Sequence, residues 1–185
     1  MTTLDDTTPF TATRVRRLGV PEHARSVRIV HDLDGIQHDV TPQALMTAGA
    51  ALWGMWERHA AFTSPDLLLG LDAGGILPTV TVSHVSGLPY RLAWKLDLDL
   101  PHKLRFSEPH ARRTDVYTYG DLSGRRILIV DDELTTGRTL TNLISALRTS
   151  GAIVTGVLCL IEDDDGEGRA AIEALEVPLC TLTRI

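Results

Sequence analysis

Short runs of consecutive apolar residues recur along the chain, and segments with helical spacing separate them. The runs are too short for buried helices and too apolar for half-exposed strands, so they predict strands of a buried parallel sheet. Between two of them, Leu140, Leu143, Ile144 and Leu147 recur at the spacing of one helix face, and Gly151 supplies a helix stop. The predicted strands are 66–71, 88–94, 127–130, 153–161 and 177–185, and the predicted helices are 41–59, 76–87, 140–150 and 170–175.

The alternation of strands and helices defines the expected fold class. It predicts an α/β domain with an open, mostly parallel sheet and helices on both faces. A chain of 185 residues is long enough for one such domain with a full core. Because the first dozen residues are rich in Thr and Asp, we predict a disordered tail at 1–12 and a single domain at 13–185, with its core at 41–185.

Composition and charge argue against several classes of function. The apolar fraction of 43% and the charged fraction of 23% are typical of a globular protein. A net charge of −6, with the basic residues dispersed, argues against a nucleic-acid partner. No apolar run reaches about 18 residues and no signal peptide is evident, so we expect a cytoplasmic protein without membrane association. Cys159 and Cys180 stand in apolar runs and are expected to be buried free thiols.

The densest polar pattern follows the apolar run at 127–130. Asp131 and Asp132 are expected to leave the carboxyl end of this strand, where ligands bind in open α/β sheets. Hydroxyls, a glycine and unpaired backbone N–H groups at the next helix N-terminus suit a phosphate, whereas the acidic pair suits vicinal hydroxyls or a hydrated Mg²⁺ ion. Together the two parts predict a site for a ribose 5-phosphate. The residues expected to hold its phosphate are Thr135, Thr136, Gly137, Arg138 and Thr139.

This pattern resembles the motif that binds phosphoribosyl pyrophosphate (PRPP) in the type I phosphoribosyltransferases. Four apolar residues, two acids, two further residues and Thr-Thr-Gly-x-Thr match over 127–139, and Glu133 departs from the usual apolar or small residue. The resemblance implies a small hood formed mainly by 13–40 and, commonly, a homodimer. It also implies that Asp131 and Asp132 are the catalytic pair, which would bind the ribose hydroxyls and hold Mg²⁺ through water or through those hydroxyls.

A second glycine-rich turn follows the strand at 66–71. By itself it is compatible with a simple tight turn, although a helix N-terminus also suits an anion. Adenine-specific members of the family usually carry Arg where Gly74 stands, and Trp94 replaces the Arg of the family's Ala-Arg-Lys segment, so the acceptor base stays open. The residues that the resemblance assigns to the pyrophosphate of PRPP are Asp72, Ala73, Gly74, Gly75 and Lys95.

The polar and basic segment at 97–120 has no regular pattern. It fits the mobile loop that family members fold over bound PRPP, and a solvated hairpin without a role is the alternative. The segment Glu108-Pro109-His110 offers a candidate acid or base, but no spacing rule identifies it as one. The residues assigned to this loop are Lys103, Arg105, Glu108, His110, Arg112 and Arg113.

Candidates for the acceptor site also come from the resemblance. Ile161 and Glu162 begin a segment similar to one near the acceptor site of adenine and xanthine phosphoribosyltransferases, although an acidic run after a strand is often a solvated turn. Trp94, Tyr117 and Tyr119 are the aromatic candidates for stacking on a base.

The interpretation we adopt is transfer of the 5-phosphoribosyl group from PRPP to a nitrogen of a purine or purine-like base, with release of pyrophosphate. The alternatives are a transferase that uses a non-purine aromatic acceptor in secondary metabolism, a non-catalytic PRPP-binding regulator, a receiver domain, and a purely structural strand-turn-helix. A receiver domain would need about 100 residues after the acidic pair, whereas 52 residues follow Glu133. It would also leave Thr-Thr-Gly-Arg-Thr unexplained.

Overall fold

A five-stranded parallel sheet forms the centre of the computed structural model, which describes residues 10–19, 26–109 and 114–185. The strands follow the order β4-β3-β7-β8-β9, and every neighbouring pair is parallel. The predicted open α/β sheet is therefore confirmed. The strands are β3 (Leu67–Leu71), β4 (Tyr90–Ala93), β7 (Arg126–Leu134), β8 (Ile153–Glu162) and β9 (Leu179–Arg184).

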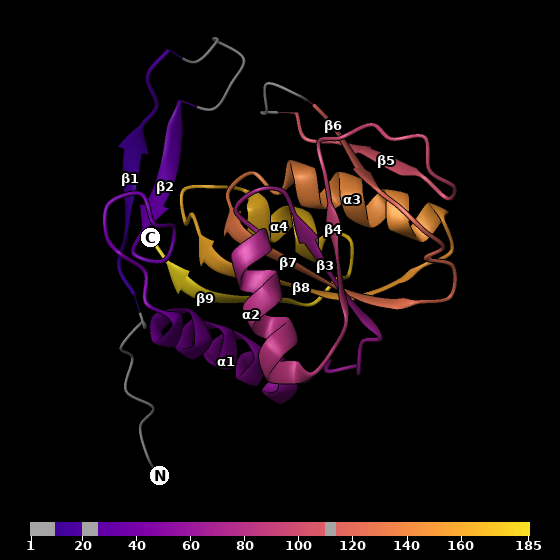
Figure 1. Cartoon of the computed structure of the whole chain (residues 1–185), viewed down its shortest axis with the longest axis horizontal. Helices are drawn as coiled ribbons and strands as arrows, with labels where there is room; N and C mark the ends of the chain where they lie inside the picture. The colour runs from indigo at the N-terminus through magenta and orange to yellow at the C-terminus, as the bar shows by residue number, and fades with distance from the viewer. Residues whose placement is uncertain (1–9, 20–25, 110–113) are drawn as a thin grey trace.

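Two pairs of helices cover the two faces of the sheet (Figure 1). Helices α1 (Pro42–Arg58) and α2 (Ile76–Ser86) pack on one face, and α3 (Arg138–Thr149) and α4 (Gly168–Glu173) pack on the other. Because successive side chains of a strand point to opposite faces, each strand contributes to two hydrophobic clusters. The sheet residues under α3 and α4 include Leu67, Leu69, Ile127, Ile129 and Val157, and those under α1 and α2 include Leu68, Leu128, Val130, Leu158 and Leu160. None of the helices in the described ranges is long and apolar enough to cross a membrane.

Helix α1 begins where the sequence predicts. The Thr41 hydroxyl accepts a hydrogen bond from the N–H of Ala44 at 3.1 Å, and Pro42 occupies the first helical position. Trp56 on this helix is fully buried against the sheet, where a Cβ atom on Gly156 would collide with its ring. Trp56 therefore has a packing role. Cys159 and Cys180 are buried free thiols, also as expected.

Strand β7 is longer than the sequence predicts. The apolar run ends at Val130, but the strand continues through the acidic pair to Leu134. The neighbouring β8 is ten residues long, so it pairs with this extension, with Asp131 opposite Cys159 and Glu133 opposite Ile161. The strand ladder satisfies the backbone of these polar residues, which side-chain polarity alone does not reveal. The acidic pair therefore projects from a fixed strand rather than from a loop, and the predicted strand end was wrong.

Two antiparallel hairpins flank the sheet. The first, β1 (Ala12–Arg16) with β2 (Val27–His31), lies beside the carboxyl ends of β8 and β9, where the predicted hood would be (Figure 1). Phe10 is buried and Ala12 begins β1, so the predicted disordered tail does not extend to residue 12, and residues 1–9 lie outside the described part.

The second hairpin, β5 (Leu104–Ser107) with β6 (Asp115–Thr118), lies within the segment 97–120, for which a solvated hairpin was the alternative to a mobile loop. Phe106 and Val116 are buried in the same cluster as α3, and the side-chain amide of Asn142 donates to the Ser107 carbonyl at 2.9 Å. This anchoring depends on residues distant in sequence, so the local pattern does not indicate it.

The edge at which β7 begins contains an ion pair with a testable pH dependence. One Asp66 oxygen accepts the backbone N–H of Arg126 at 3.0 Å and the other accepts from its guanidinium at 2.6 Å. These hydrogen bonds from Arg126 lower the pKa of Asp66 to about 2. A lowered pKa in the folded state stabilises the protein above the unfolded-state value of about 3.9. That stabilisation is lost as the pH falls toward about 2.

We therefore expect Asp66→Asn to lower the free energy of unfolding at pH 7 and to have progressively less effect between pH 4 and pH 2.5. Urea denaturation across this range measures the difference, with the exposed Asp39→Asn as a control. An effect of the same size at every pH would contradict the assignment of the stabilisation to the carboxylate charge.

Candidate active site

The predicted site residues converge on a crevice at the carboxyl edge of the sheet. The chain passes from β3 outward to β4 on one side, and from β7 outward to β8 and β9 on the other. The loops that follow β3 and β7 therefore diverge, and in open α/β sheets such a reversal of strand order is where ligands bind. A cavity of about 340 Å³ opens at this point.

This first cavity brings together motifs that lie about sixty residues apart in the sequence. Its walls come from the loop after β3, the end of β7, the start of α3 and the end of β4. Glu133, which stands where the family motif usually has an apolar or small residue, also lines the cavity. Gly75 is the one predicted pyrophosphate residue outside the lining, and it precedes α2. The predicted site residues that line the cavity are Asp72, Ala73, Gly74, Lys95, Glu108, Asp131, Asp132, Thr135, Thr136, Gly137, Arg138 and Thr139.

The start of α3 forms one wall of the cavity. Gly137 caps the helix with a φ of 69°, a left-handed conformation that costs other residues free energy. A Cβ atom at this position would also stand 3.0 Å from the Gly168 carbonyl oxygen, which belongs to the backbone and cannot yield easily. The first N–H groups of a helix have no partners within the helix and the helix dipole is positive there, so this wall suits an anion.

The acidic pair forms the floor of the cavity and faces the loop after β3. The Asp132 N–H donates to Asp131 Oδ1 at 3.0 Å. Burial and the negative charge of Asp132 raise the pKa of Asp131 well above its ordinary value. A Cβ atom on Gly74 would overlap the Asp132 carboxylate, and one on Gly75 would crowd Asp131. The two glycines therefore let the β3 loop approach the acidic pair, and a side chain at position 74 would displace Asp132.

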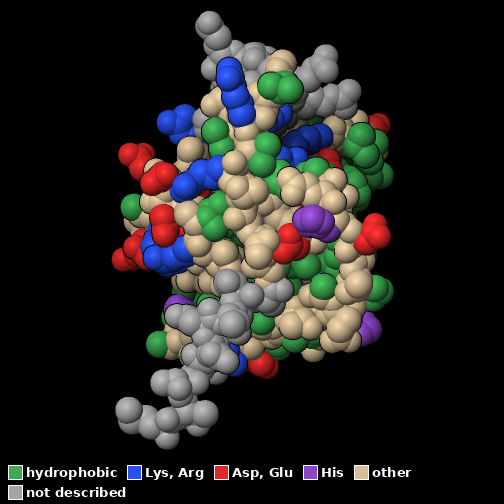
Figure 2. Space-filling view, turned by 90° about the vertical axis from the view of Figure 1, so that its left-hand side faces the viewer, with side chains coloured by type: hydrophobic (Ala, Val, Ile, Leu, Met, Phe, Trp, Pro, Cys, Tyr) green, Lys and Arg blue, Asp and Glu red, His purple; other side chains and the backbone are tan. Residues whose placement is uncertain are grey.

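Cationic side chains also line the cavity. Lys95 donates to the Asp72 carbonyl at 3.1 Å and pairs with Glu108 at 2.9 Å. Arg17 and Arg28, from the β1–β2 hairpin, line the cavity as well. Figure 2 views this end of the molecule and shows Lys and Arg side chains over the upper half of the face. Sequence analysis missed both arginines because no local pattern shows that this hairpin stands over the sheet.

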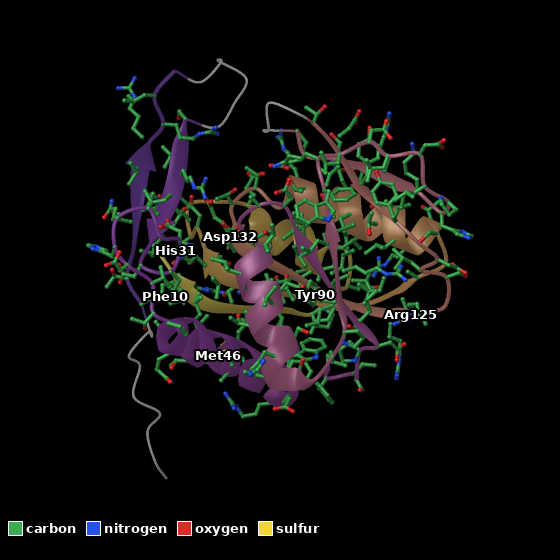
Figure 3. The ribbon with its side chains drawn as sticks, viewed as in Figure 1. Phe10, His31, Met46, Tyr90, Arg125 and Asp132 are labelled. Carbon is green, nitrogen blue, oxygen red and sulfur yellow. The ribbon has the colours of Figure 1, made fainter. Side chains whose placement is uncertain are left out.

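A second cavity, of about 180 Å³, adjoins the first. The two share Arg28, Ala73, Gly74 and Asp132. In Figure 3, His31 of the hairpin and Asp132 of β7 lie on neighbouring elements beside this space. The second cavity is mostly apolar and has few polar side chains. Its remaining lining residues are His31, Leu33, Asp34, Leu45, Ala48, Leu77, Pro78, Thr81 and Leu160.

Comparison with known proteins identifies the family to which this site belongs. Residues 40–183 match the model of the phosphoribosyl transferase domain. The chain belongs to the phosphoribosyltransferase family. This range contains both the acidic pair and the wall formed by α3, so the resemblance suggested by 127–139 extends to most of the chain.

Individual relatives agree with this family. An adenine phosphoribosyltransferase of Mycolicibacterium paratuberculosis is 38% identical over 150 residues, which are 77% of this chain and 82% of that protein. A xanthine phosphoribosyltransferase of Chloroflexus aurantiacus is 29% identical over 183 residues, 96% of this chain and 83% of its own. The crystal structure of an adenine phosphoribosyltransferase from Thermoanaerobacter pseudethanolicus shares the fold with a TM-score of 0.71. It is 19% identical and covers 94% of this chain and 95% of its own.

Most of the residues assigned to the mobile loop stand elsewhere. Lys103 pairs with Asp97 at 2.7 Å and lies over the Tyr117 ring, and Arg105 lies 3.7 Å from Asp115. Neither basic residue lines the two cavities. Of the described loop residues, Glu108 alone does so. The predictions for His110, Arg112 and Arg113 lie outside the described residues.

The two acceptor candidates are the last two residues of β8. Ile161 and Glu162 are buried, and neither lines either cavity. The Glu162 carboxylate accepts from the Arg169 guanidinium at 2.7 Å and faces Arg184 at 3.2 Å. Burial alone would raise the pKa of Glu162, but the hydrogen bonds from Arg169 and Thr181 and the two positive charges lower it. This ion cluster joins β8 to β9 and α4, and a role of Ile161 and Glu162 at the acceptor stays a prediction.

The aromatic candidates are also used within the fold. Trp94 and Tyr117 exchange two backbone hydrogen bonds of 2.8 Å, which join the end of β4 to β6. The Tyr119 hydroxyl accepts the N–H of Leu98 at 2.8 Å. None of the three aromatic side chains lines either cavity, so a stacking role for any of them stays a prediction.

Proposed function

We propose that this chain transfers the 5-phosphoribosyl group of PRPP to a ring nitrogen of a purine base and releases pyrophosphate. One observation carries the proposal. The first cavity combines an anion-binding helix start with an acidic pair that has spare lone pairs, at the reversal of strand order. The names of the adenine and xanthine relatives support a purine as the acceptor.

The reaction breaks the bond between the anomeric carbon of ribose and the pyrophosphate oxygen, which leaves with the electron pair. The lone pair of the acceptor nitrogen forms the new C–N bond, and that base finally loses a proton. Positive charge develops on the ribose ring during this exchange, so positioning and electrostatics supply most of the catalysis.

Each wall of the first cavity has a role in this scheme. The residues Thr135 to Thr139 hold the 5-phosphate and fix the ring. Asp131 and Asp132 accept hydrogen bonds from the ribose hydroxyls, and their negative charge stabilises the developing cation. Lys95 and the backbone of Ala73 and Gly74 receive the pyrophosphate. Lys95 already pairs with Glu108, so bound pyrophosphate would replace the Glu108 carboxylate as the partner of Lys95.

The acidic pair also suits Mg²⁺, which prefers oxygen ligands and retains water. Within 10–19, 26–109 and 114–185, no group of three His, Cys, Asp or Glu side chains could hold a metal ion. Asp131 and Asp132 would therefore bind Mg²⁺ through water or together with PRPP oxygens. The bound ion would neutralise charge on the departing pyrophosphate.

The second cavity is our proposed site for the acceptor base. It shares Gly74 and Asp132 with the first cavity, so a base bound there would lie beside the ribose. Its apolar lining suits a flat ring, and its few polar groups would orient that ring. The proposal thus assigns the acceptor to the space between the β1–β2 hairpin and α2.

Pyrophosphate release from PRPP and Mg²⁺ tests the proposal, measured against purines, pyrimidines and small aromatic acids, with PRPP binding followed by calorimetry. We expect turnover with at least one purine. Turnover with a non-purine aromatic base only would favour the secondary-metabolism alternative. Binding of PRPP without turnover would favour the regulatory alternative, and absence of PRPP binding would refute the site itself.

We also propose a homodimer, as the family resemblance implies. Multi-angle light scattering at micromolar concentration tests this, because it measures the molar mass directly. A mass near twice 20.2 kDa is expected, and a monomer mass at every concentration would contradict it.

A further inference from the structure

The second cavity contains a histidine with a defined hydrogen-bonding pattern. His31 ends β2, and 8% of its surface is exposed. The backbone N–H of Leu33 donates to His31 Nδ1 at 3.2 Å, so Nδ1 carries a lone pair and the proton of the neutral ring is on Nε2. Burial lowers the pKa of His31, which favours this neutral form.

The Nε2–H group of His31 is the polar group that the ring can offer to a ligand. In the described part of the chain no hydrogen bond engages Nε2, although the ring lies 5.7 Å from that of Phe10. The residue lines the second cavity (Figure 3). Nε2 is not among the buried polar atoms that lack a partner, so it is accessible from the cavity, and a ligand that accepts a hydrogen bond can replace solvent there.

The other polar side chains make the cavity rich in donors. The Arg28 guanidinium can only donate, and it makes no hydrogen bond or ion pair within the described residues. Thr81 directs its hydroxyl to the Leu77 and Pro78 carbonyls. Each Asp34 oxygen already accepts a backbone N–H, from His31 at 3.0 Å and from Ile36 at 2.7 Å. The Asp132 carboxylate also lines the cavity, but the proposed function assigns it to the ribose hydroxyls. The side-chain groups left to contact a base are therefore the Nε2–H of His31 and the Arg28 guanidinium, and both are donors.

We infer that the acceptor base carries an oxo group, as in the 6-oxopurines, and that the Nε2–H of His31 is the donor that selects it over the 6-amino analogue. An oxo group accepts hydrogen bonds and is attracted to the Arg28 charge, whereas an exocyclic amine would direct its own N–H groups at these donors. The inference rests on the proposed function, because it concerns the acceptor of that reaction.

The first test uses the unmodified protein and compares kcat/KM for hypoxanthine and xanthine with that for adenine. We expect an oxopurine to be preferred by at least about tenfold, since a hydrogen-bonding site discriminates against a base that leaves its donors unpaired. Preference for adenine would overturn the inference and leave the transferase intact, and would point to Asp34 as the selecting group. Turnover of no base would instead count against the proposed function.

The second test changes the donor itself. His31→Phe keeps an aromatic ring beside Phe10 and removes the N–H, so the ratio of oxopurine to adenine kcat/KM should fall by about 10- to 100-fold, mainly through the oxopurine KM. His31→Gln returns an N–H group to a similar position and should restore part of the ratio. The matched control is His84→Phe, at an exposed position on α2, which should leave the ratio unchanged.

A purely structural role for His31 has a different signature. It would lower activity with every base equally and leave the ratio unchanged, which would overturn the inference. Should His31→Phe fail to fold, calorimetry of inosine and adenosine monophosphates with the unmodified protein measures the same preference. Tighter binding of the adenosine compound would then contradict the inference.

Discussion

Replacing Asp131 and Asp132 together by Asn should lower turnover by about 10²- to 10³-fold or more, because the substitution removes the negative charge that the acidic pair directs at the developing ribosyl cation. The fold should survive this change. Burial and the Asp132 charge disfavour an ionised Asp131, as its raised pKa indicates. An Asn side chain can still accept the N–H of residue 132, so the free energy of unfolding should be unchanged or higher. Pyrophosphate release and urea denaturation measure the two effects.

The matched control for the acidic pair is Asp164→Asn with Asp165→Asn. It removes the same charge from the turn after β8, where both side chains are more than half exposed. We expect near-normal turnover in this control. Equal losses in both double variants would mean that net charge, rather than the position of the acidic pair, governs activity.

Gly137→Ala should weaken the phosphate wall and the fold together. The left-handed conformation at this position costs an L-residue about 1–2 kcal/mol, and the added Cβ would also crowd the Gly168 carbonyl. We expect the free energy of unfolding to fall by at least that amount. The KM for PRPP should rise by at least about tenfold, because the N–H groups at the start of α3 would move away from the phosphate.

Gly87→Ala is the control that separates the effect of Gly137→Ala on stability from its effect on PRPP binding. Gly87 ends α2 with a similar φ of 73°, and no atom lies within 4 Å of a Cβ built there. This control should show a comparable conformational cost with an unchanged KM for PRPP. If Gly137→Ala also leaves that KM unchanged, the start of α3 does not bind the 5-phosphate.

The sequence by itself determined the fold class and the two motifs of the first cavity. Apolar runs such as Ile127 to Val130 are long enough for strands and too uniform for half-exposed ones, so they require a sheet covered on both faces. The glycine and hydroxyl pattern after Asp132 is local and depends on the start of one helix, which is why a short segment was enough to indicate it. Both inferences rest on patterns that are visible within short segments of the sequence.

The tertiary structure alone decided which residues complete the site. Arg28 and His31 reach the cavities because the β1–β2 hairpin packs over the carboxyl end of the sheet, and no pattern within the hairpin indicates this contact. Glu162 was assigned to the acceptor from the family resemblance, and in the structure the distant Arg184 and the neighbouring α4 place it in a buried ion cluster. Contacts between segments far apart in the chain depend on how whole elements pack, so they cannot be deduced from the local order of residues.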